Sequence, residues 1–178
     1  MSGSKEMDHG ELALLVIDVQ QGLFEKGTPI FQAEALLDKI NSLVDRAHAQ
    51  DVPVFYVQHN DHRGLVKGSH EWQLHAQIQP VKKDSIVHKQ HPNAFEQTSL
   101  DQTLRKKGIS RLVICGLVTH GCVKASCLGA LELGYRVTLV KDGHSSYSAQ
   151  AAVLIDEWNQ KLGEKGTEIK PAAGILFD

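Results

Sequence analysis

Apolar and polar positions along the chain follow two different periods. Continuous apolar runs of strand length occur at residues 12–19 (LALLVIDV) and 111–118 (RLVICGLV), and such runs are typical of strands covered on both faces. Other segments space their apolar residues three and four apart. In residues 35–50, Leu36 and Ile40 belong to one apolar helical face. The pattern therefore predicts buried strands flanked by amphipathic helices.

Strand and helix alternate about six times. Strands are predicted at residues 12–19, 52–59, 85–89, 111–118, 136–142 and 167–175, and helices at 35–50, 98–108, 121–134 and 148–166. This alternation is typical of βαβ units, and it predicts a three-layer α/β/α fold with a Rossmann-like, mostly parallel sheet of five or six strands. In such sheets ligands bind beyond the carboxyl ends of the strands.

Length and charge narrow the functional classes. The chain has 178 residues, which predicts a single domain over residues 11–178. The polar residues 1–10 predict a flexible leader and show no secretory signal. A net charge of −2 without a basic stripe argues against nucleic-acid binding, and the longest apolar run is too short for a membrane span. Three cysteines, unable to pair completely, fit free thiols in the cytoplasm.

Three residues with useful chemistry lie at or just after predicted strand ends. Asp18 closes the first strand, Lys89 closes the third, and Cys122 follows the fourth at the start of a helix. Each alone has an ordinary reading as a turn residue, a solvated lysine or a buried thiol. Because parallel strands present their carboxyl ends at one edge, we expect the three side chains to meet there.

An acid, a lysine and a thiol together suit acyl transfer through a thioester. A helix N-terminus and the Lys89 ammonium both favour the thiolate, so we expect Cys122 to have a lowered pKa and to alkylate well below pH 8. Asp18 can take the thiol proton and return it to a leaving amine. Cys115 and Cys127 fall on predicted buried faces and are interpreted as core packing.

The sequence also resembles the isochorismatase-like cysteine hydrolases, which include nicotinamidases. The segments that carry the resemblance are LLVIDVQQGLF (14–24), VHKQHPNAFEQTSL (87–100), VICGLVTHGCVKAS (113–126) and ALELGYRVTLVKDGHSS (130–146). They cover nearly the whole chain after the leader, in the order and spacing of the family. The resemblance implies an isochorismatase-like hydrolase fold.

By this resemblance Cys122 is the nucleophile, Asp18 the acid and base, and Lys89 the partner that stabilises the thiolate. It also implies a cis peptide between Leu117 and Val118, with the backbone amides of Val118 and Cys122 forming an oxyanion hole. One position departs from the family, which usually has Glu or Asp two residues before the cysteine. This chain has His120 there, which concerns substrate preference rather than the reaction class.

Histidines gather in the polar segment 60–79 and just before it. The residue types that could bind a metal there are His59, Asp61, His62, His70 and His75. Their order does not reproduce the Asp-x-His motif with which nicotinamidases bind a divalent ion, so we expect neither metal nor other cofactor.

The leading hypothesis is a hydrolase that cleaves a C–N amide bond of a small molecule and releases ammonia or an amine. We expect its pocket to be lined by Phe24, Trp72, Leu74 and His120, and the protein to form a homo-oligomer, a dimer or larger. Three alternatives stay open: vinyl-ether hydrolysis of the isochorismatase type, a metal-assisted nicotinamidase, and a non-catalytic binding protein with the same fold.

Overall fold

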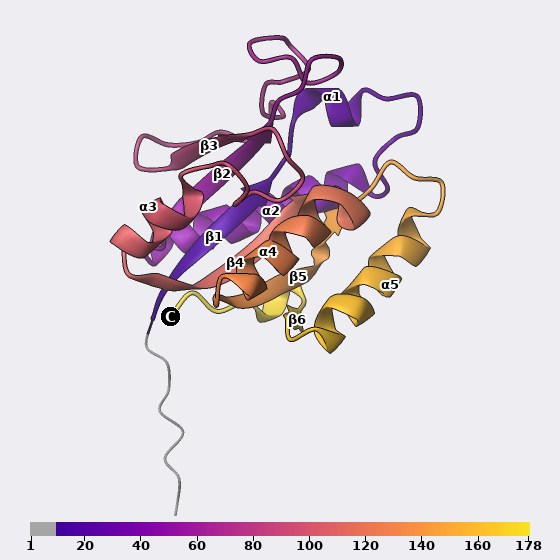
Figure 1. Cartoon of the computed structure of the whole chain (residues 1–178). Helices are drawn as coiled ribbons and strands as arrows, with labels where there is room; N and C mark the ends of the chain where they lie inside the picture. The colour runs from indigo at the N-terminus through magenta and orange to yellow at the C-terminus, as the bar shows by residue number, and fades with distance from the viewer. Residues whose placement is uncertain (1–9) are drawn as a thin grey trace, which may run out of the picture.

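A computed structural model describes residues 10–178 of the protein (Figure 1). Most of the predicted leader, residues 1–9, lies outside the described residues. The elements in chain order are β1 (Glu11–Ile17), α1 (Gln21–Phe24), α2 (Ala33–Ala49), β2 (Val54–His59), β3 (Ser85–Lys89), α3 (Leu100–Lys106), β4 (Ile109–Leu117), η1 (Thr119–Val123), α4 (Lys124–Glu132), β5 (Arg136–Ser145), α5 (Ala151–Glu164), β6 (Glu168–Lys170) and η2 (Ala172–Gly174).

The sheet is parallel and has six strands, in agreement with the sequence prediction. Its six strands lie in the order β3-β2-β1-β4-β5-β6, and each neighbouring pair is parallel. The connections therefore run outward from β1 to one edge and then outward from β4 to the other. This is the strand order of the doubly wound dinucleotide-binding folds, with its switch point between β1 and β4.

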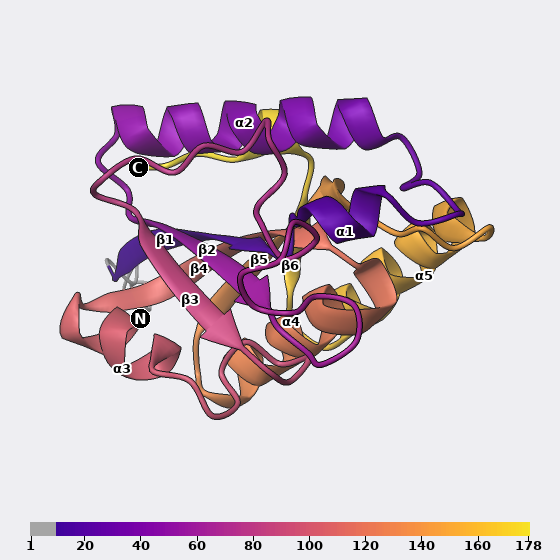
Figure 2. The same ribbon diagram turned by 90° about the horizontal axis from the view of Figure 1, so that it is seen from above.

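Helices cover both faces of the sheet, so the three-layer prediction is confirmed. Figure 2 shows α2 on one side of the strands and α3, α4 and α5 on the other. The segment that follows β6 returns along the α2 side, where Ala172, Ile175 and Phe177 join the core beneath that helix.

Alternate residues of each central strand supply the two cores. In β1, Leu14 and Val16 pack toward α2, whereas Ala13 and Leu15 pack toward α3 and α4. Successive strand residues point to opposite faces, and both faces here are covered. The continuous apolar run in the sequence has this cause.

A glycine allows β1 and β4 to approach closely at the switch point. Gly116 has φ +125°, and a Cβ built there would lie 2.1 Å from the backbone oxygen of Ile17. Only glycine fits both the backbone conformation and the space. The residues that follow on each strand, Asp18 and Leu117, are thereby brought side by side.

Some local structure departs from the sequence pattern. The short helix α1 was not predicted, and β5 extends to Ser145, three residues beyond its predicted end. Residues 60–79 form neither helix nor ladder strand; their one link of strand type is an isolated bridge between Gln20 and Leu74. Among residues 10–178, no helix has the length and apolarity to cross a membrane.

Candidate active site

The three residues predicted from strand ends meet at the carboxyl edge of the sheet. Asp18 follows β1, Lys89 ends β3, and Cys122 lies in the turn after β4. Asp18 and Lys89 are almost fully buried, at 2% and 1% exposure, and Cys122 is half-buried. Asp18 itself has φ +49°, a conformation that Asp tolerates better than most residues.

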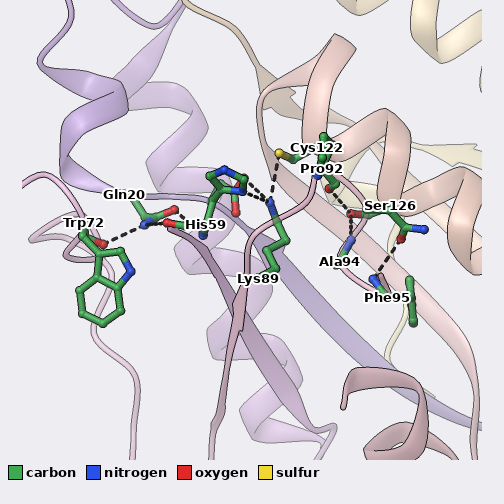
Figure 3. Close-up of polar contacts among 11 residues, drawn as sticks. Gln20, His59, Trp72, Lys89, Pro92, Ala94, Phe95, Cys122 and Ser126 are labelled. Carbon is green, nitrogen blue, oxygen red and sulfur yellow. Dashed lines mark hydrogen bonds and ion pairs between the residues drawn. The ribbon is translucent and has the colours of Figure 1, made fainter. Parts of the chain in front are cut away.

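The ammonium of Lys89 lies at the centre of the group. Its Nζ is 3.1 Å from Asp18 Oδ2, 3.1 Å from Cys122 Sγ and 2.9 Å from His59 Nδ1 (Figure 3 shows the contacts to His59 and Cys122). An ammonium has three N–H donors and no acceptor, so these contacts use all of them. The bare Nδ1 of His59 must accept, which places the proton of a neutral ring on Nε2.

A buried glutamine holds His59 in place. The side-chain amide of Gln20 accepts from the backbone N–H of His59 and donates to its backbone oxygen, both at 2.9 Å. The side-chain nitrogen of Gln20, Nε2, also donates to the backbone oxygen of Trp72 at 2.9 Å. Gln20 is fully buried, and it ties the ends of β1 and β2 to the long segment 60–79.

Cys122 sits in an irregular turn between β4 and α4. The Leu117–Val118 peptide bond is cis. The turn η1 is a single π-helical turn in which Gly121 leaves helical geometry, at φ −114° and ψ −112°. The carbonyl of Val118 accepts hydrogen bonds from the backbone N–H groups of Gly121 and Val123. These two bonds hold the turn together at its start.

The loop after Lys89 is fastened to the helix after Cys122. The hydroxyl of Ser126 accepts from the backbone N–H of Ala94 at 3.0 Å and donates to the backbone oxygen of Pro92 at 3.4 Å (Figure 3). These bonds fix the spacing between the lysine and the thiol along the edge of the sheet.

The electrostatics of the thiol differ from the expectation of a lowered pKa. The pKa of Cys122 is raised to about 12, first by burial and then by the negative charge of Asp18, while the Lys89 ammonium acts against both. With Asp18 ionised, a thiolate would add a second negative charge to a buried site that holds one cation. The raised pKa favours the thiol form of Cys122, and Asp18 is placed to receive its proton.

The carboxylate keeps one oxygen available for that proton. Asp18 Oδ2 accepts from Lys89, while Oδ1 is buried and has no hydrogen-bond partner among the described residues. The ligand atoms of Asp18 and Cys122 lie within 4.8 Å of each other. A proton acceptor beside a nucleophilic sulfur is the arrangement that covalent catalysis needs.

Comparison with known proteins agrees with this geometry. Residues 12–157 match the family model of the isochorismatase domain. The chain belongs to the isochorismatase family. It is 34% identical over 179 residues to a streptothricin hydrolase of Streptomyces noursei, covering 93% of this chain and 64% of that protein. The chain thus spans slightly less than two thirds of this relative. An uncharacterised isochorismatase-family protein of Bacillus subtilis strain 168 is 30% identical, over 78% of this chain and 79% of that protein.

Solved structures of the family share the fold. A crystal structure of an isochorismatase-family protein superposes with a TM-score of 0.84 at 28% identity, covering 89% of this chain and 96% of that one. N-carbamoylsarcosine amidase from Thermoplasma acidophilum gives a TM-score of 0.79 at 23% identity, covering 93% and 98% of the two chains. These likenesses agree with the family-model match and the streptothricin hydrolase relative, which identify the protein as an isochorismatase-family hydrolase.

A cavity of about 340 Å³ opens over the thiol of this family member. Its lining residues are Asp18, Gly22, Leu23, Lys26, His59, Asp61, Gly64, Leu65, Glu71, Val118, Cys122 and Tyr147. The apolar part of the wall comes from Leu23, Leu65, Val118 and Tyr147. A small molecule is the size of ligand that such a cavity accepts.

The pocket walls predicted from the sequence are not the walls of this cavity. The ring of Phe24 packs on His75 at 4.5 Å, and the ring of Trp72 on His88 at 5.1 Å. Phe24 and Leu74 pack against the core beneath α2. His120 is half-buried, and its Nδ1 is buried without a partner among the described residues. Trp72 and Leu74 belong to segment 60–79, whose backbone is held from Gln20, and this segment instead contributes Leu65 to the cavity wall.

The rim of the cavity has more acidic than basic groups. Three backbone N–H groups, of Arg63, Gly64 and Leu65, donate to Asp61 Oδ1, and they lower the pKa of that carboxyl to about 2. The exposed carboxylate of Glu71 is a second negative group. The ammonium of Lys26, 5.0 Å from the ring centre of Tyr147, is the cation among the lining residues.

The residues that could bind a metal do not form a free site. Among residues 10–178, one set of three such side chains lies close together, namely Asp18, His59 and Cys122. The Lys89 ammonium contacts all three, so a cation already occupies the centre of the set. His70 instead pairs with Glu25 at 2.7 Å. The arrangement therefore does not fit the metal site of the nicotinamidases.

The sequence did not predict the contacts that Gln20 and His59 make in the site, although His59 was considered there as a possible metal ligand. Gln20 follows the first strand in a polar stretch, and His59 ends the second strand. The signal for His59 was its place at a strand end, the same argument that identified Lys89. His59 and Lys89 are register partners on β2 and β3.

Proposed function

We propose that the protein is a cysteine amidohydrolase that cleaves a C–N amide bond of a small molecule through a thioester. The observation that carries the proposal is the placement of the Lys89 ammonium 3.1 Å from both the Asp18 carboxylate and the Cys122 sulfur. The proposal covers the reaction and the roles of residues, which go beyond membership of the family.

In the first half of the reaction Cys122 Sγ attacks the amide carbon while its proton passes to Asp18. The carbonyl oxygen becomes an oxyanion, which the backbone N–H groups of Val118 and Cys122 stabilise. The intermediate collapses as the C–N bond breaks, and Asp18 donates its proton to the leaving nitrogen. Ammonia or an amine leaves, and the acyl group stays on sulfur.

In the second half water attacks the thioester carbon and Asp18 takes the proton of the water. The C–S bond breaks, the carboxylic acid leaves, and the sulfur recovers the proton from Asp18. The sum is amide plus water giving acid plus amine. Lys89 supplies a constant positive charge next to the sulfur, so the thiolate that attacks and leaves costs less to form.

The charged rim suggests the class of substrate. The cavity lining holds two carboxylates, of Asp61 and Glu71, and one ammonium, that of Lys26. A cleft lined mostly by negative groups attracts positively charged ligands. An amide that also bears an amino group therefore fits the site better than an anionic one. The identity to a streptothricin hydrolase makes streptothricin the first substrate to test.

The deciding experiment measures the hydrolysis of streptothricin, as the gain of one water by mass spectrometry, and the release of ammonia or amine from a panel of small amides, for the parent protein and for Cys122→Ala and Cys122→Ser. We expect the parent to turn over at least one amide and both variants to lose that activity by several orders of magnitude, as for other covalent nucleophiles. A Cys122→Ala protein that keeps a tenth of the parent rate would exclude the thioester. It would favour vinyl-ether hydrolysis, which needs Asp18 but no thiol.

Assembly into a homo-oligomer stays a prediction, as does the cytoplasmic location. Light scattering on the purified protein would test the first of these.

A further inference from the structure

A chain of three buried polar side chains connects helix α5 to the turn that holds Cys122. Thr119 opens the turn, His144 lies near the end of β5, and Asn159 lies on α5. They are 0%, 3% and 6% exposed. A polar group is costly to bury unless it is hydrogen-bonded, and each of these is bonded to the next.

The directions of these hydrogen bonds follow from their far end. Asn159 Nδ2 donates to the backbone oxygen of Lys141 at 3.0 Å, so Oδ1 is the atom that faces His144 Nε2 at 2.9 Å. An amide oxygen only accepts, and therefore His144 Nε2 carries a proton. Burial lowers the pKa of His144, which keeps the ring neutral and Nδ1 bare. The hydroxyl of Thr119 then donates to Nδ1 at 2.8 Å.

The near end of the chain is at the reacting centre. Thr119 directly follows Val118, which lines the active-site cavity, and precedes Cys122 by three residues. His144 is the register partner of Gly116 on β4. The three side chains thus fasten the turn both to the sheet and to a helix that packs on the turn from outside.

The turn needs such an anchor for a local reason. Gly121 lies outside helical geometry, and no side chain at that position restricts the backbone. Two backbone hydrogen bonds of the turn, donated by Gly121 and Val123, end on the carbonyl of Val118. The Thr119 side chain connects the start of this turn to His144, 25 positions away in the sequence.

We propose that Thr119, His144 and Asn159 form a positioning relay. Its task is to hold the backbone N–H groups of Val118 and Cys122 where the substrate oxyanion forms. The inference rests on the proposed function, because it assumes that the reaction passes through an oxyanion. None of the three side chains need touch the substrate, so they are positioning residues.

Two reactions of the same sulfur separate this role from a merely structural one. Acylation by 4-nitrophenyl acetate passes through an oxyanion, whereas alkylation by iodoacetamide does not. Both can be followed on the full chain without knowing the physiological substrate. A residue that positions the oxyanion amides should affect the first reaction and spare the second.

The matched variants are Thr119→Val, which keeps the shape but removes the hydroxyl, and Thr119→Ser, which keeps the hydroxyl. For Thr119→Val we expect acylation of Cys122 to slow by about tenfold to hundredfold, since small displacements at a reacting centre and lost oxyanion contacts have effects of this size. Alkylation should stay within about twofold of the parent. Thr119→Ser should restore acylation to within about threefold.

Three results would overturn the relay. These are unchanged acylation in Thr119→Val, an equal loss in acylation and alkylation, and an equal loss in the Val and Ser variants, which would show that the shape of the side chain matters as much as its hydroxyl. A parent protein that alkylates at Cys122 but is not acylated there would instead contradict the proposed function.

A measurement on the parent protein tests the hydrogen bonds on which the relay depends even where Thr119→Val does not fold. Long-range ¹H–¹⁵N NMR correlations report which nitrogen of His144 carries the proton. We expect the neutral Nε2–H form at pH 7. A proton on Nδ1, or a ring protonated on both nitrogens at pH 7, would overturn the relay.

Discussion

His59 Nδ1 lies 2.9 Å from the Lys89 ammonium and accepts its third hydrogen bond. A neutral imidazole can accept this hydrogen bond, whereas a protonated imidazole has no free acceptor and would place a second positive charge beside the ammonium. Burial, and after it the charge of Lys89, lower the pKa of His59. The lysine that serves the thiol therefore depends on an uncharged neighbour.

This contact predicts a loss of stability in acid. Because the pKa of His59 is lower in the folded than in the unfolded chain, its contribution is present above about pH 6.5 and is lost as the pH falls toward the folded value. His59→Asn keeps an acceptor oxygen and does not titrate. We expect the drop in melting temperature between pH 8 and pH 5 to be smaller in this variant, by differential scanning calorimetry. An equal drop in both proteins would contradict the role given to His59.

The ligand atoms of Asp18 and Cys122 lie within 4.8 Å of each other, and this predicts opposite effects of an Asp18 variant on two readouts. Asp18→Asn removes the negative charge that raises the pKa of the thiol, so the sulfur should alkylate faster at pH 8 than in the parent. The same variant cannot move the proton and should lose turnover by several orders of magnitude. Lys89→Met serves as the contrast, because removing the cation should slow alkylation. Slower alkylation of Asp18→Asn would show that Asp18 does not raise the pKa of the thiol.

The same site predicts activity without a divalent metal. The Lys89 ammonium occupies the centre of the Asp18, His59 and Cys122 set. Turnover of an amide should persist after prolonged dialysis against EDTA, with metal content followed by mass spectrometry. Loss on chelation and recovery with zinc or iron would point to a metal-assisted nicotinamidase instead.

The sequence predicted the site where a residue type and a strand end coincide. Asp18 and Lys89 each terminate an apolar run, so the geometry of a parallel sheet was enough to bring them together. The pocket walls were not predictable in this way. Segment 60–79 has no period, and its path depends on hydrogen bonds from Gln20 that join residues 39 and 52 positions apart.

The electrostatics were also beyond the sequence pattern. A lysine and a helix start suggested a lowered pKa for Cys122, but burial and the approach of Asp18 act in the other direction and are larger. Both depend on tertiary packing. The relay residues His144 and Asn159 are likewise separated from Thr119 by 25 and 40 positions, and nothing local distinguishes them.

The close approach of β1 and β4 at Gly116 predicts that a larger residue at this position destabilises the protein. Gly116→Ala places a methyl group 2.1 Å from the Ile17 oxygen at φ +125°, so β1 and β4 must separate. Gly134→Ala is the control, since Gly134 has φ +91° with nothing within 4 Å of a Cβ. We expect the control to lose about 1–2 kcal/mol of unfolding free energy from the backbone conformation alone, and Gly116→Ala clearly more, by urea denaturation. Equal losses would mean that the close approach has no energetic weight.

The acidic rim predicts a preference for positively charged amides. β-Alaninamide and propanamide share the scissile group and differ in one ammonium. Asp61→Asn retains an acceptor oxygen for the backbone N–H groups of segment 63–65 but removes the charge. We expect the kcat/KM of this variant for β-alaninamide to fall by about fivefold, since a charge pair near a protein surface contributes about 1 kcal/mol, while the value for propanamide is unchanged. The loss of kcat/KM for β-alaninamide should be smaller in 1 M salt, where charges are screened.

Glu132 is the control position, because it is exposed and lies outside the cavity lining. Glu132→Gln should alter neither kcat/KM value. Equal losses for both amides would indicate that Asp61 shapes the loop and does not select charge.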